Sequence, residues 1–499
     1  MIDDRRGWAG RDWLALALVG LGAGVLRLVD LTRPAGFVFD EIFYARNACR
    51  FMIDTSACGI DDLVSGAHPP LGNWIIGVGI RLFGMDEFGW RITSALAGTL
   101  TVALLFVLAR RLLRDRVAPP AATVGSVAAA ALLALDPLHL VQSRVAMLDS
   151  LVTLFAVATV LFAVVDMSRH RDAAGSDAFA APWLRRLTLG RPWRLATGAS
   201  LGAAAAVKWS GAYVALGIVA LLIAVEVASV RATAADHGYP VRWWAGLRVA
   251  VRQELLPSLV LLGIVPLVIY VASYVGRVDG AVLAAPWSEG SFWRGVADHQ
   301  VAMLRFHVGL EGHHPYESAP WSWLLLQRPV AYSFAVEGDR YREVLAIGNP
   351  LTWWGGAAAV VGLAIGWART GAGWFRAEPI MLIGALATYL PWLILSGSRS
   401  QVFIWYILPT IPFLCAALGV VAARAWESGA GRVAVSVASV AVLAWVTFFY
   451  PVLTAQPMTP DDWRARMWLT DCQRPGAPTL GLPDDEISSG PPPSGWCWI

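Results

Sequence analysis

The sequence predicts an all-α polytopic membrane protein, and three observations support this. Hydrophobic residues make up 57% of the 499 residues, only 15% are charged, and the mean hydropathy is +0.56. A soluble protein of this length needs more charge to cover its surface. Apolar runs of about 20 residues recur, each long enough to cross roughly 30 Å of hydrocarbon as a helix. The 25 tryptophans, many near the ends of these runs, fit interfacial anchoring.

We expect about eleven transmembrane helices that form one unit over residues 1–499. Their predicted limits are 12–32, 88–113, 121–141, 147–167, 194–208, 210–230, 254–275, 351–368, 379–396, 402–423 and 433–452. Arginines gather in alternate connections, and these connections are cytoplasmic if the N-terminus is cytoplasmic. An odd number of spans then places the C-terminus outside the cytoplasm. No cleavable signal peptide is evident before the first span.

This orientation makes 33–87 the first extracytoplasmic loop, 276–350 a large extracytoplasmic loop, and 453–499 an extracytoplasmic tail. The large loop is long for a structureless connection, so we expect interfacial helices in it, one starting near Phe292-Trp293 and one near Trp321.

The cysteines of the outer segments form two candidate pairs. The first loop carries Cys49 and Cys58, and the tail carries Cys472 and Cys497. A disulfide within each pair is one interpretation if the compartment is oxidising, and free thiols are the other.

The first outer loop contains two features that could carry chemistry. Asp40 and Glu41 follow the first span between apolar neighbours that would hold them against the bilayer, so one carboxylate can act as a general base while the other orients a group. A solvated acidic loop is the alternative. His68 stands before two prolines, which restrict its backbone and would present it rigidly, although a histidine near a loop end is also often structural.

Further charged residues lie at the outer ends of predicted spans. Arg91 opens the second span, Arg144 and Asp149 bracket the turn between the third and fourth, and Lys208 is the chain's single lysine. Snorkelling explains many such residues. Charges at these positions are nevertheless functional candidates, and an arginine fork would suit a phosphate.

The segment 313–318 in the large loop adds His314, Tyr316 and Glu317, next to a second histidine. Its spacing matches no compact zinc-ligand pattern, and neither do the five cysteines, so we predict no metal site. No other cofactor is indicated, and a divalent-cation requirement is left open. The net charge of +3 gives no reason to expect a nucleic-acid partner.

Together these residues favour chemistry on a lipid-linked substrate. The predicted outer side offers carboxylates and cations but no phosphate-binding glycine loop, so an activated donor would come from the membrane. A lipid-linked sugar phosphate fits, because a phosphate leaving group needs cationic stabilisation more than a proton. One carboxylate base would then suffice, and direct displacement would invert the anomeric centre.

The ordered set of motifs resembles the protein O-mannosyltransferases. The motifs are Phe39-Asp40-Glu41, His68-Pro69-Pro70-Leu71-Gly72, Arg91, the turn from Ser143-Arg144 to Asp149-Ser150, and Ala206-Val207-Lys208-Trp209-Ser210-Gly211. His314-Pro315-Tyr316-Glu317-Ser318 looks like the bacterial, in particular actinobacterial, branch.

The resemblance implies a GT-C type glycosyltransferase in the plasma membrane with an extracytoplasmic active site. It would move mannose from polyprenyl-phosphate mannose to Ser or Thr hydroxyls of secreted or membrane proteins, with the export translocon as a further candidate partner. Asp40 would be the catalytic base, facing the acceptor hydroxyl, and Glu41 would support the acceptor or the base. The donor phosphate or its surroundings would involve His68, Arg91, Arg144, Asp149 and Lys208, and the acceptor side His314, Tyr316 and Glu317. The family often has a basic residue where this chain has Asn73, so another cation would have to substitute.

Other functions stay open at this level. A related GT-C transferase could glycosylate a lipid or a cell-wall glycan with the same spans and donor class. A transporter or flippase would place its polar site near mid-membrane and between repeats, whereas the charges here lie at predicted outer ends and no repeat is evident. A purely structural membrane protein would leave the ordered motifs unexplained.

Overall fold

The computed structural model describes residues 8–53, 58, 66–174, 191–236, 238–275, 292–309, 314, 316–371, 373–398 and 401–467. His313, the Cys472–Cys497 pair and the end of the tail lie outside the described residues.

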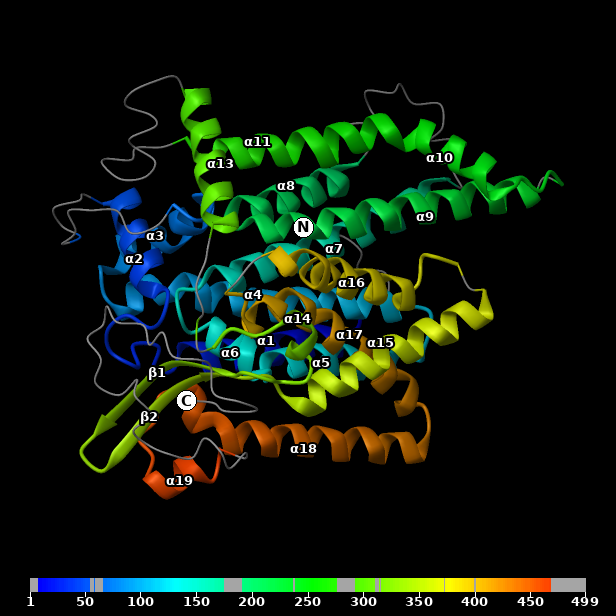
Figure 1. Ribbon diagram of the computed structural model, residues 1–499. Helices are drawn as coiled ribbons and strands as arrows, with labels where there is room; N and C mark the ends of the chain where they lie inside the picture. The colour runs from blue at the N-terminus through cyan, green and yellow to red at the C-terminus, as the bar shows by residue number, and fades with distance from the viewer. Residues whose placement is uncertain are drawn as a thin grey trace.

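Long helices run side by side and form the body of the molecule (Figure 1). They are α1 (Gly10–Leu28), α4 (Glu87–Leu113), α5 (Pro119–Ala134), α7 (Leu148–Ala174), α8 (Pro192–Val207), α9 (Tyr213–Asp236), α10 (Trp243–Ser258), α15 (Pro350–Thr370), α16 (Ala377–Leu395), α17 (Ile411–Trp426) and α18 (Gly429–Leu453). A π-helical turn, Leu259–Ile264, joins α10 to α11 (Val265–Ala272). This irregular turn lies between Pro257 and Pro266, whose missing N–H groups interrupt the regular helical ladder.

Seven helices among the described residues are long and apolar enough to cross a membrane. They are Glu87–Leu113, Leu148–Arg169, Trp209–Asp236, Pro350–Thr370, Ala377–Leu395, Ile404–Trp426 and Gly429–Leu453. Each of the eleven predicted spans overlaps a helix, but some of these helices are shorter or more polar than a full span. The predicted class of polytopic all-α membrane protein is confirmed, while the number of spans and the sidedness of the ends stay predictions.

The centre of the bundle depends on close backbone approach. At the crossing of α5 and α17, a Cβ atom at Gly125 would lie 2.5 Å from the Gly419 carbonyl oxygen, and one at Gly419 would lie 2.5 Å from the Gly125 oxygen. Small residues are typical of such contacts in membranes, where dispersion forces replace the hydrophobic effect as the driving force. α17 is almost wholly buried and α18 mostly exposed.

Shorter elements cover one end of the bundle (Figure 1). They are α2 (Glu41–Met52), α3 (Leu71–Phe83), α6 (Pro137–Gln142), α13 (Phe292–Val308), α14 (Pro320–Trp323), α19 (Pro460–Arg464), and the antiparallel hairpin of β1 (Val330–Glu337) and β2 (Arg340–Ala346). The helices predicted near Phe292 and Trp321 are therefore present as α13 and the short α14. A bridge between Tyr341 and Met458 ties the hairpin to the chain after α18.

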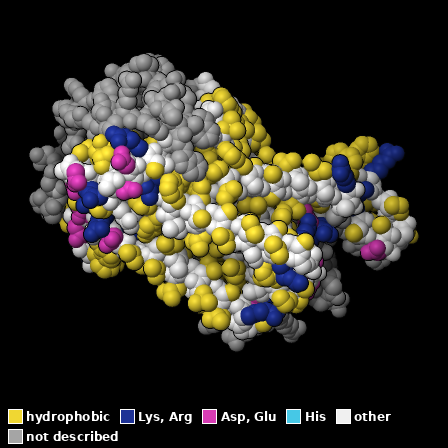
Figure 2. Space-filling view, turned by 90° about the horizontal axis from the view of Figure 1, so that it is seen from below, with side chains coloured by type: hydrophobic (Ala, Val, Ile, Leu, Met, Phe, Trp, Pro, Cys, Tyr) yellow, Lys and Arg dark blue, Asp and Glu magenta, His cyan; other side chains and the backbone are white. Residues whose placement is uncertain are grey.

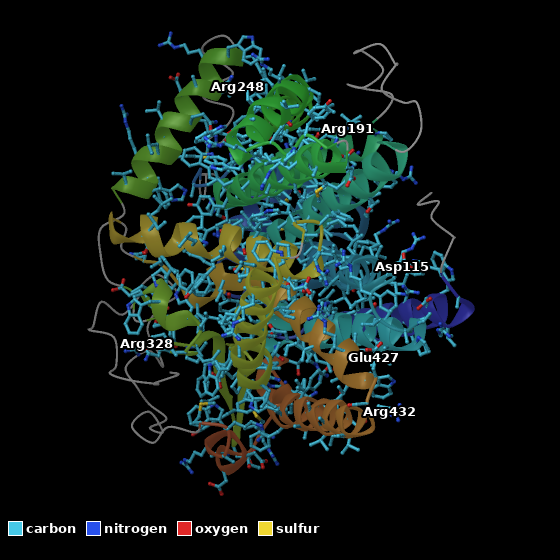
Figure 3. The ribbon with its side chains drawn as sticks, turned by 90° about the vertical axis from the view of Figure 1, so that its right-hand side faces the viewer. Asp115, Arg191, Arg248, Arg328, Glu427 and Arg432 are labelled. Carbon is cyan, nitrogen blue, oxygen red and sulfur yellow. A yellow bond between two sulfur atoms is a disulfide. The ribbon has the colours of Figure 1, made fainter. Side chains whose placement is uncertain are left out.

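The distribution of side chains on the surface follows the long direction of the helices. Figure 2 shows hydrophobic side chains over the middle of the visible face and charged side chains gathered toward its two ends. Figure 3 looks onto the end opposite α2 and α3, where Arg191, Arg248 and Arg432 are labelled. These three arginines come from connections that the sequence analysis assigns to one side of the membrane.

Candidate active site

Asp40 lies half-buried at the N-terminus of α2, as its N-cap residue. The preceding residue, Phe39, has a φ of 52°, which bulky residues rarely adopt. The Phe39 ring stacks on Tyr332 at 4.9 Å between centroids and meets Trp405 edge-on at 5.1 Å. Aromatic packing therefore holds a strained backbone directly before the carboxylate, and such strain is common at functional sites.

Glu41 and Arg91 form a fully buried ion pair. Arg91 Nε donates to Glu41 Oε1 and Arg91 Nη2 to Glu41 Oε2, both at 2.9 Å. The backbone N–H groups of Val38 and Ala146 also donate to this carboxylate, at 2.8 and 2.7 Å. Arg91 further donates to the carbonyl oxygens of Leu31, Pro34 and Gly36. All five guanidinium N–H groups can thus be engaged within the protein, and the pair fixes the start of α2.

Arg144 satisfies the C-terminal end of α1. Its Nη1 and Nη2 donate to the carbonyl oxygens of Leu26, Arg27, Val29 and Asp30 at 2.7 to 3.2 Å. A cation is favourable at a helix C-terminus because the last carbonyls have no partner within the helix. The same turn supplies the Ala146 N–H to Glu41, so it joins α1 and α2.

Asp149 and Lys208 form a second buried pair close to Asp40. Lys208 Nζ lies 3.0 Å from both Asp149 carboxylate oxygens and 4.2 Å from the centroid of the Tyr406 ring. Burial raises the pKa of the Asp40 carboxyl to about 7, with the Lys208 charge opposing this shift and the Asp149 charge adding to it. A carboxyl that titrates near neutral pH is suited to accept a proton.

Three tyrosines that the sequence analysis did not single out surround these carboxylates. Burial beside Asp40 and Asp149 raises the pKa of Tyr44 and of Tyr332 well above the ordinary value, so both hydroxyls stay protonated. Tyr44 follows Asp40 by one turn of α2, a spacing that could have revealed it. Tyr332 and Tyr406 come from β1 and from the helical turn Ile404–Thr410, and no sequence spacing connects them to Asp40.

The segment with His68 leads into α3 beside the second ion pair. The His68 ring lies 6.0 Å from Tyr44 and 5.5 Å from His307 between centroids. At Gly72, a Cβ atom would lie 2.5 Å from Leu148 Cδ2 and 3.4 Å from Val207 Cγ1. Since these two residues immediately precede Asp149 and Lys208, the absence of a side chain at Gly72 lets α3 pack directly on the site. Asn73, the next residue, is also buried.

The segment around His314 lies beside Phe39. The His314 ring is 6.3 Å from Phe39 and 5.2 Å from Phe403 between centroids. The Glu317 carboxylate accepts a hydrogen bond from the His314 backbone N–H at 3.2 Å, and Tyr316 lies next to the His314 ring. The fold therefore brings three distant sequence motifs to one end of the bundle. Among the described residues, no group of three potential ligand side chains could hold a metal ion.

Two features border the site on the side of α2 and α3. Cys49 and Cys58 form a disulfide, so the first of the two candidate pairs is joined. A largely apolar groove of about 500 Å³ runs between α2, α3 and the end of α11. Its lining residues are Phe51, Met52, Leu71, Trp74, Ile269, Ala272, Ser273 and Val275.

Comparison with known proteins identifies the family. Residues 17–274 match the model of the dolichyl-phosphate-mannose–protein mannosyltransferases, and residues 292–472 match the C-terminal four TMM region of protein O-mannosyltransferases. The chain belongs to the protein O-mannosyltransferase family. It is a glycosyltransferase and a multi-pass membrane protein, as the sequence analysis predicted.

Curated relatives extend over nearly the whole chain. The polyprenol-phosphate-mannose–protein mannosyltransferase of Mycobacterium tuberculosis is 31% identical over 92% of this chain and 91% of its own. The proteins of the same name from Mycolicibacterium smegmatis and Corynebacterium glutamicum are 29% and 27% identical, covering 94% and 85% of this chain and 93% and 84% of their own.

Solved structures show that the fold is of the GT-C type. The Saccharomyces cerevisiae Pmt1–Pmt2 complex bound to the sugar donor matches with a TM-score of 0.67 at 15% identity, covering 93% of this chain and 92% of that chain. ArnT of Cupriavidus metallidurans bound to undecaprenyl phosphate matches with a TM-score of 0.50 at 21% identity, over 87% of this chain and 64% of that chain.

Proposed function

We propose that the protein transfers mannose from polyprenyl-phosphate mannose to serine or threonine hydroxyls of exported proteins. The observation that carries this proposal is Asp40, a half-buried carboxylate with a pKa raised to about 7 beside a buried lysine–aspartate pair. The family and the mycobacterial relatives support the donor and the acceptor class. We further propose that transfer takes place at the extracytoplasmic face of the plasma membrane, with Asp40 at that face.

In this mechanism Asp40 acts on the acceptor. Its ionised carboxylate accepts the proton of the serine or threonine hydroxyl as the oxygen attacks C1 of mannose. The bond between C1 and the phosphate oxygen breaks on the opposite face, so the anomeric configuration inverts. The electron pair of that bond goes to the polyprenyl phosphate, which leaves as an anion and needs no proton.

Lys208 is the cation that we assign to the leaving phosphate. Its ammonium group already balances Asp149 and lies at the C-terminal end of α8, close to Asp40, where we expect negative charge to develop during transfer. Arg91 and Arg144 were the other cations among the predicted donor residues, but their guanidinium groups bind carbonyl oxygens of the protein and, for Arg91, the Glu41 carboxylate. We therefore assign them, with Glu41, to positioning the start of α2. His68 would border the donor near Lys208.

The apolar groove between α2, α3 and α11 offers a place for part of the polyprenyl chain. Leu71 lines it and directly precedes Gly72, which packs against the neighbours of Asp149 and Lys208. On the other side of Asp40, the segment with His314, Tyr316 and Glu317 is placed to meet the acceptor polypeptide. Export through a translocon would present such polypeptides unfolded, and we retain the translocon as a candidate partner.

The test is transfer of labelled mannose from polyprenyl-phosphate mannose to a threonine-rich peptide by the purified protein. We expect transfer by the wild type and a loss of at least ~100-fold in Asp40→Asn, the usual order for a general base. Both proteins should show the same thermal midpoint in detergent. Transfer that survives in Asp40→Asn would move the base elsewhere. If the enzyme used the donor only with a lipid or a cell-wall glycan as acceptor, the proposed protein acceptor would be wrong.

A further inference from the structure

Helix α13, in the large outer loop, has three main faces, and the exposed Ala302 and Phe306 lie between the charged face and the inner face. An exposed apolar stripe recurs at helical spacing and consists of Trp293, Ala297, Val301, Leu304 and Val308. An exposed charged face consists of Arg294, Asp298 and Arg305. An inner face, directed at the protein, consists of Val296, His299, Gln300, Met303 and His307. A helix in solution would not expose such a stripe, and a spanning helix would not carry the charged face.

The placement of α13 agrees with this pattern. Figure 1 shows it running across the direction of α9 and α11, next to the end of the bundle that carries α2 and α3. A helix with one apolar and one charged exposed face, set across the ends of spanning helices, matches the geometry of an interfacial helix. Lipid at the boundary between head groups and acyl chains would cover Val301 and Leu304, while Asp298 would face water.

The inner face of α13 joins two parts of the site by a continuous hydrogen-bond chain. In the first half, Trp209 Nε1 donates to Tyr270 Oη (2.9 Å), and Tyr270 Oη donates to Gln300 Oε1 (2.6 Å). In the second half, Gln300 Nε2 donates to Tyr274 Oη (2.8 Å), and Tyr274 Oη donates to His299 Nδ1 (3.0 Å). His299 Nε2 then donates to the Gly66 carbonyl oxygen (3.0 Å). Each group donates in one direction, and the histidine is required in its neutral form. Burial lowers the pKa of His299, which favours that form.

Both ends of this chain are next to residues of the proposed donor site. Trp209 directly follows Lys208, and Gly66 lies two residues before His68. A second histidine of α13 strengthens the link, because His307 Nε2 donates to the Ala67 carbonyl oxygen at 2.9 Å. The ring of His307 also lies 6.0 Å from Trp209 and 5.5 Å from His68. Gln300 is the midpoint, since its amide accepts from one half of the chain and donates to the other.

We propose that α13 is an interfacial helix of the outer leaflet and that Gln300 is a positioning residue that sets the distance between Lys208 and the His68 segment. The role in donor binding rests on the proposed function. Lipid contact holds the outer face of α13 and the hydrogen-bond chain holds its inner face. The helix therefore forms the lipid-side wall of the donor site.

The first experiment measures steady-state kinetics of Gln300→Leu, which removes the two hydrogen bonds at the midpoint of the chain and keeps a similar side-chain volume. We expect the KM for polyprenyl-phosphate mannose to rise about tenfold, with kcat and the peptide KM changed less than about threefold, the pattern of lost ground-state binding. A purely structural role would lower the active fraction and leave the donor KM unchanged. The matched control, Asp298→Asn, lies on the charged face of the same helix and should behave as wild type.

A double variant tests the hydrogen-bond chain through Gln300. Tyr270→Phe should raise the donor KM by itself, and adding it to Gln300→Leu should raise the KM no further, because both act through one chain. An unchanged donor KM in an active Gln300→Leu enzyme overturns the proposal, as does an effect confined to the peptide KM. Mannose transfer by the wild type in the same assay tests the proposed function independently of the effect of Gln300→Leu.

The lipid contact is tested without turnover. The variants Val301→Cys and Asp298→Cys are made separately in a protein whose Cys472 and Cys497 are replaced by serine. Each purified variant is reconstituted in liposomes and exposed on both sides of the membrane to a charged maleimide. We expect Asp298→Cys to react about tenfold faster than Val301→Cys, because the interface shields the apolar stripe. Equal rates at the two positions in liposomes would overturn the interfacial placement.

Discussion

Asp40 and Glu41 are adjacent in sequence, have the same charge and end in opposite environments. Glu41 is fully buried, and its carboxylate receives two bonds from Arg91 and one from each of two backbone N–H groups. Asp40 is half-buried, and no donor among the described residues is hydrogen-bonded to its carboxylate. A saturated buried group can only hold structure in place, whereas an unsaturated one at the surface of a site can exchange a proton. The buried scaffold around Arg91 is therefore distinct from the reacting centre that we propose around Asp40.

The largest effect is expected at the scaffold. Glu41→Gln leaves the Arg91 charge buried without its counter-ion, so we expect a loss of about 3–5 kcal/mol of stability, as for one partner removed from a buried pair. Thermal unfolding in detergent measures this. The paired variant Glu41→Gln with Arg91→Met removes both charges and should recover part of the loss. A Glu41→Gln protein as stable as wild type would show that this ion pair does not anchor α2.

The next effect concerns the second ion pair. Lys208→Met should lower transfer by about 100-fold, because it removes the cation assigned to the leaving phosphate. It also leaves Asp149 buried and unpaired. Adding Asp149→Asn should restore the thermal midpoint without restoring transfer, which distinguishes a chemical role from a structural one. Recovery of transfer in the double variant would place Lys208 with the scaffold.

A steric change tests how closely α3 packs on the site. Gly72→Ala places a methyl group 2.5 Å from Leu148 Cδ2, so we expect a destabilisation of about 1–3 kcal/mol from overpacking. Transfer should also fall, since Leu148 and Val207 precede Asp149 and Lys208. Gly366→Ala in α15 is the matched control, because a Cβ there meets nothing within 4 Å. Equal thermal midpoints for the two variants would contradict the contact.

The smallest expected effect is the pH dependence. In the proposed mechanism Asp40 acts as a base only when ionised, and burial raises its pKa to about 7. The value of kcat/KM should therefore be low below pH 6, rise about tenfold between pH 6 and pH 8, and level off above that range. The profile of the free enzyme is measured at low donor concentration. A profile that is flat through this range would remove Asp40 as the titrating base.

Much of the site could be predicted from the sequence because its residues lie in short ordered motifs at span ends. The Asp40-Glu41 pair, His68, Asp149 and Lys208 converge in the structure, although 168 positions separate the first and the last of these residues. By sequence alone Arg91, Arg144 and Lys208 are similar candidates, since each is a cation at a predicted outer end. Tertiary packing separates them. Backbone carbonyls saturate both guanidinium groups, together with the Glu41 carboxylate in the case of Arg91, whereas the Lys208 ammonium group pairs with Asp149 close to Asp40.

The sequence by itself determined the membrane class and the family, because apolar run length and motif order are local and survive without knowledge of packing. It also determined which residues could ionise at the ends of the spans. Only the tertiary structure decided which of them are saturated, because hydrogen-bond partners such as the Leu31, Pro34 and Gly36 carbonyls have no sequence signature. The same holds for Tyr332 and Tyr406 around Asp40 and for the chain through Gln300. These contacts form between elements that are far apart in the sequence and that packing brings together. The chemistry of these groups depends on the distances between them in the folded protein, and their order in the sequence does not reveal those distances.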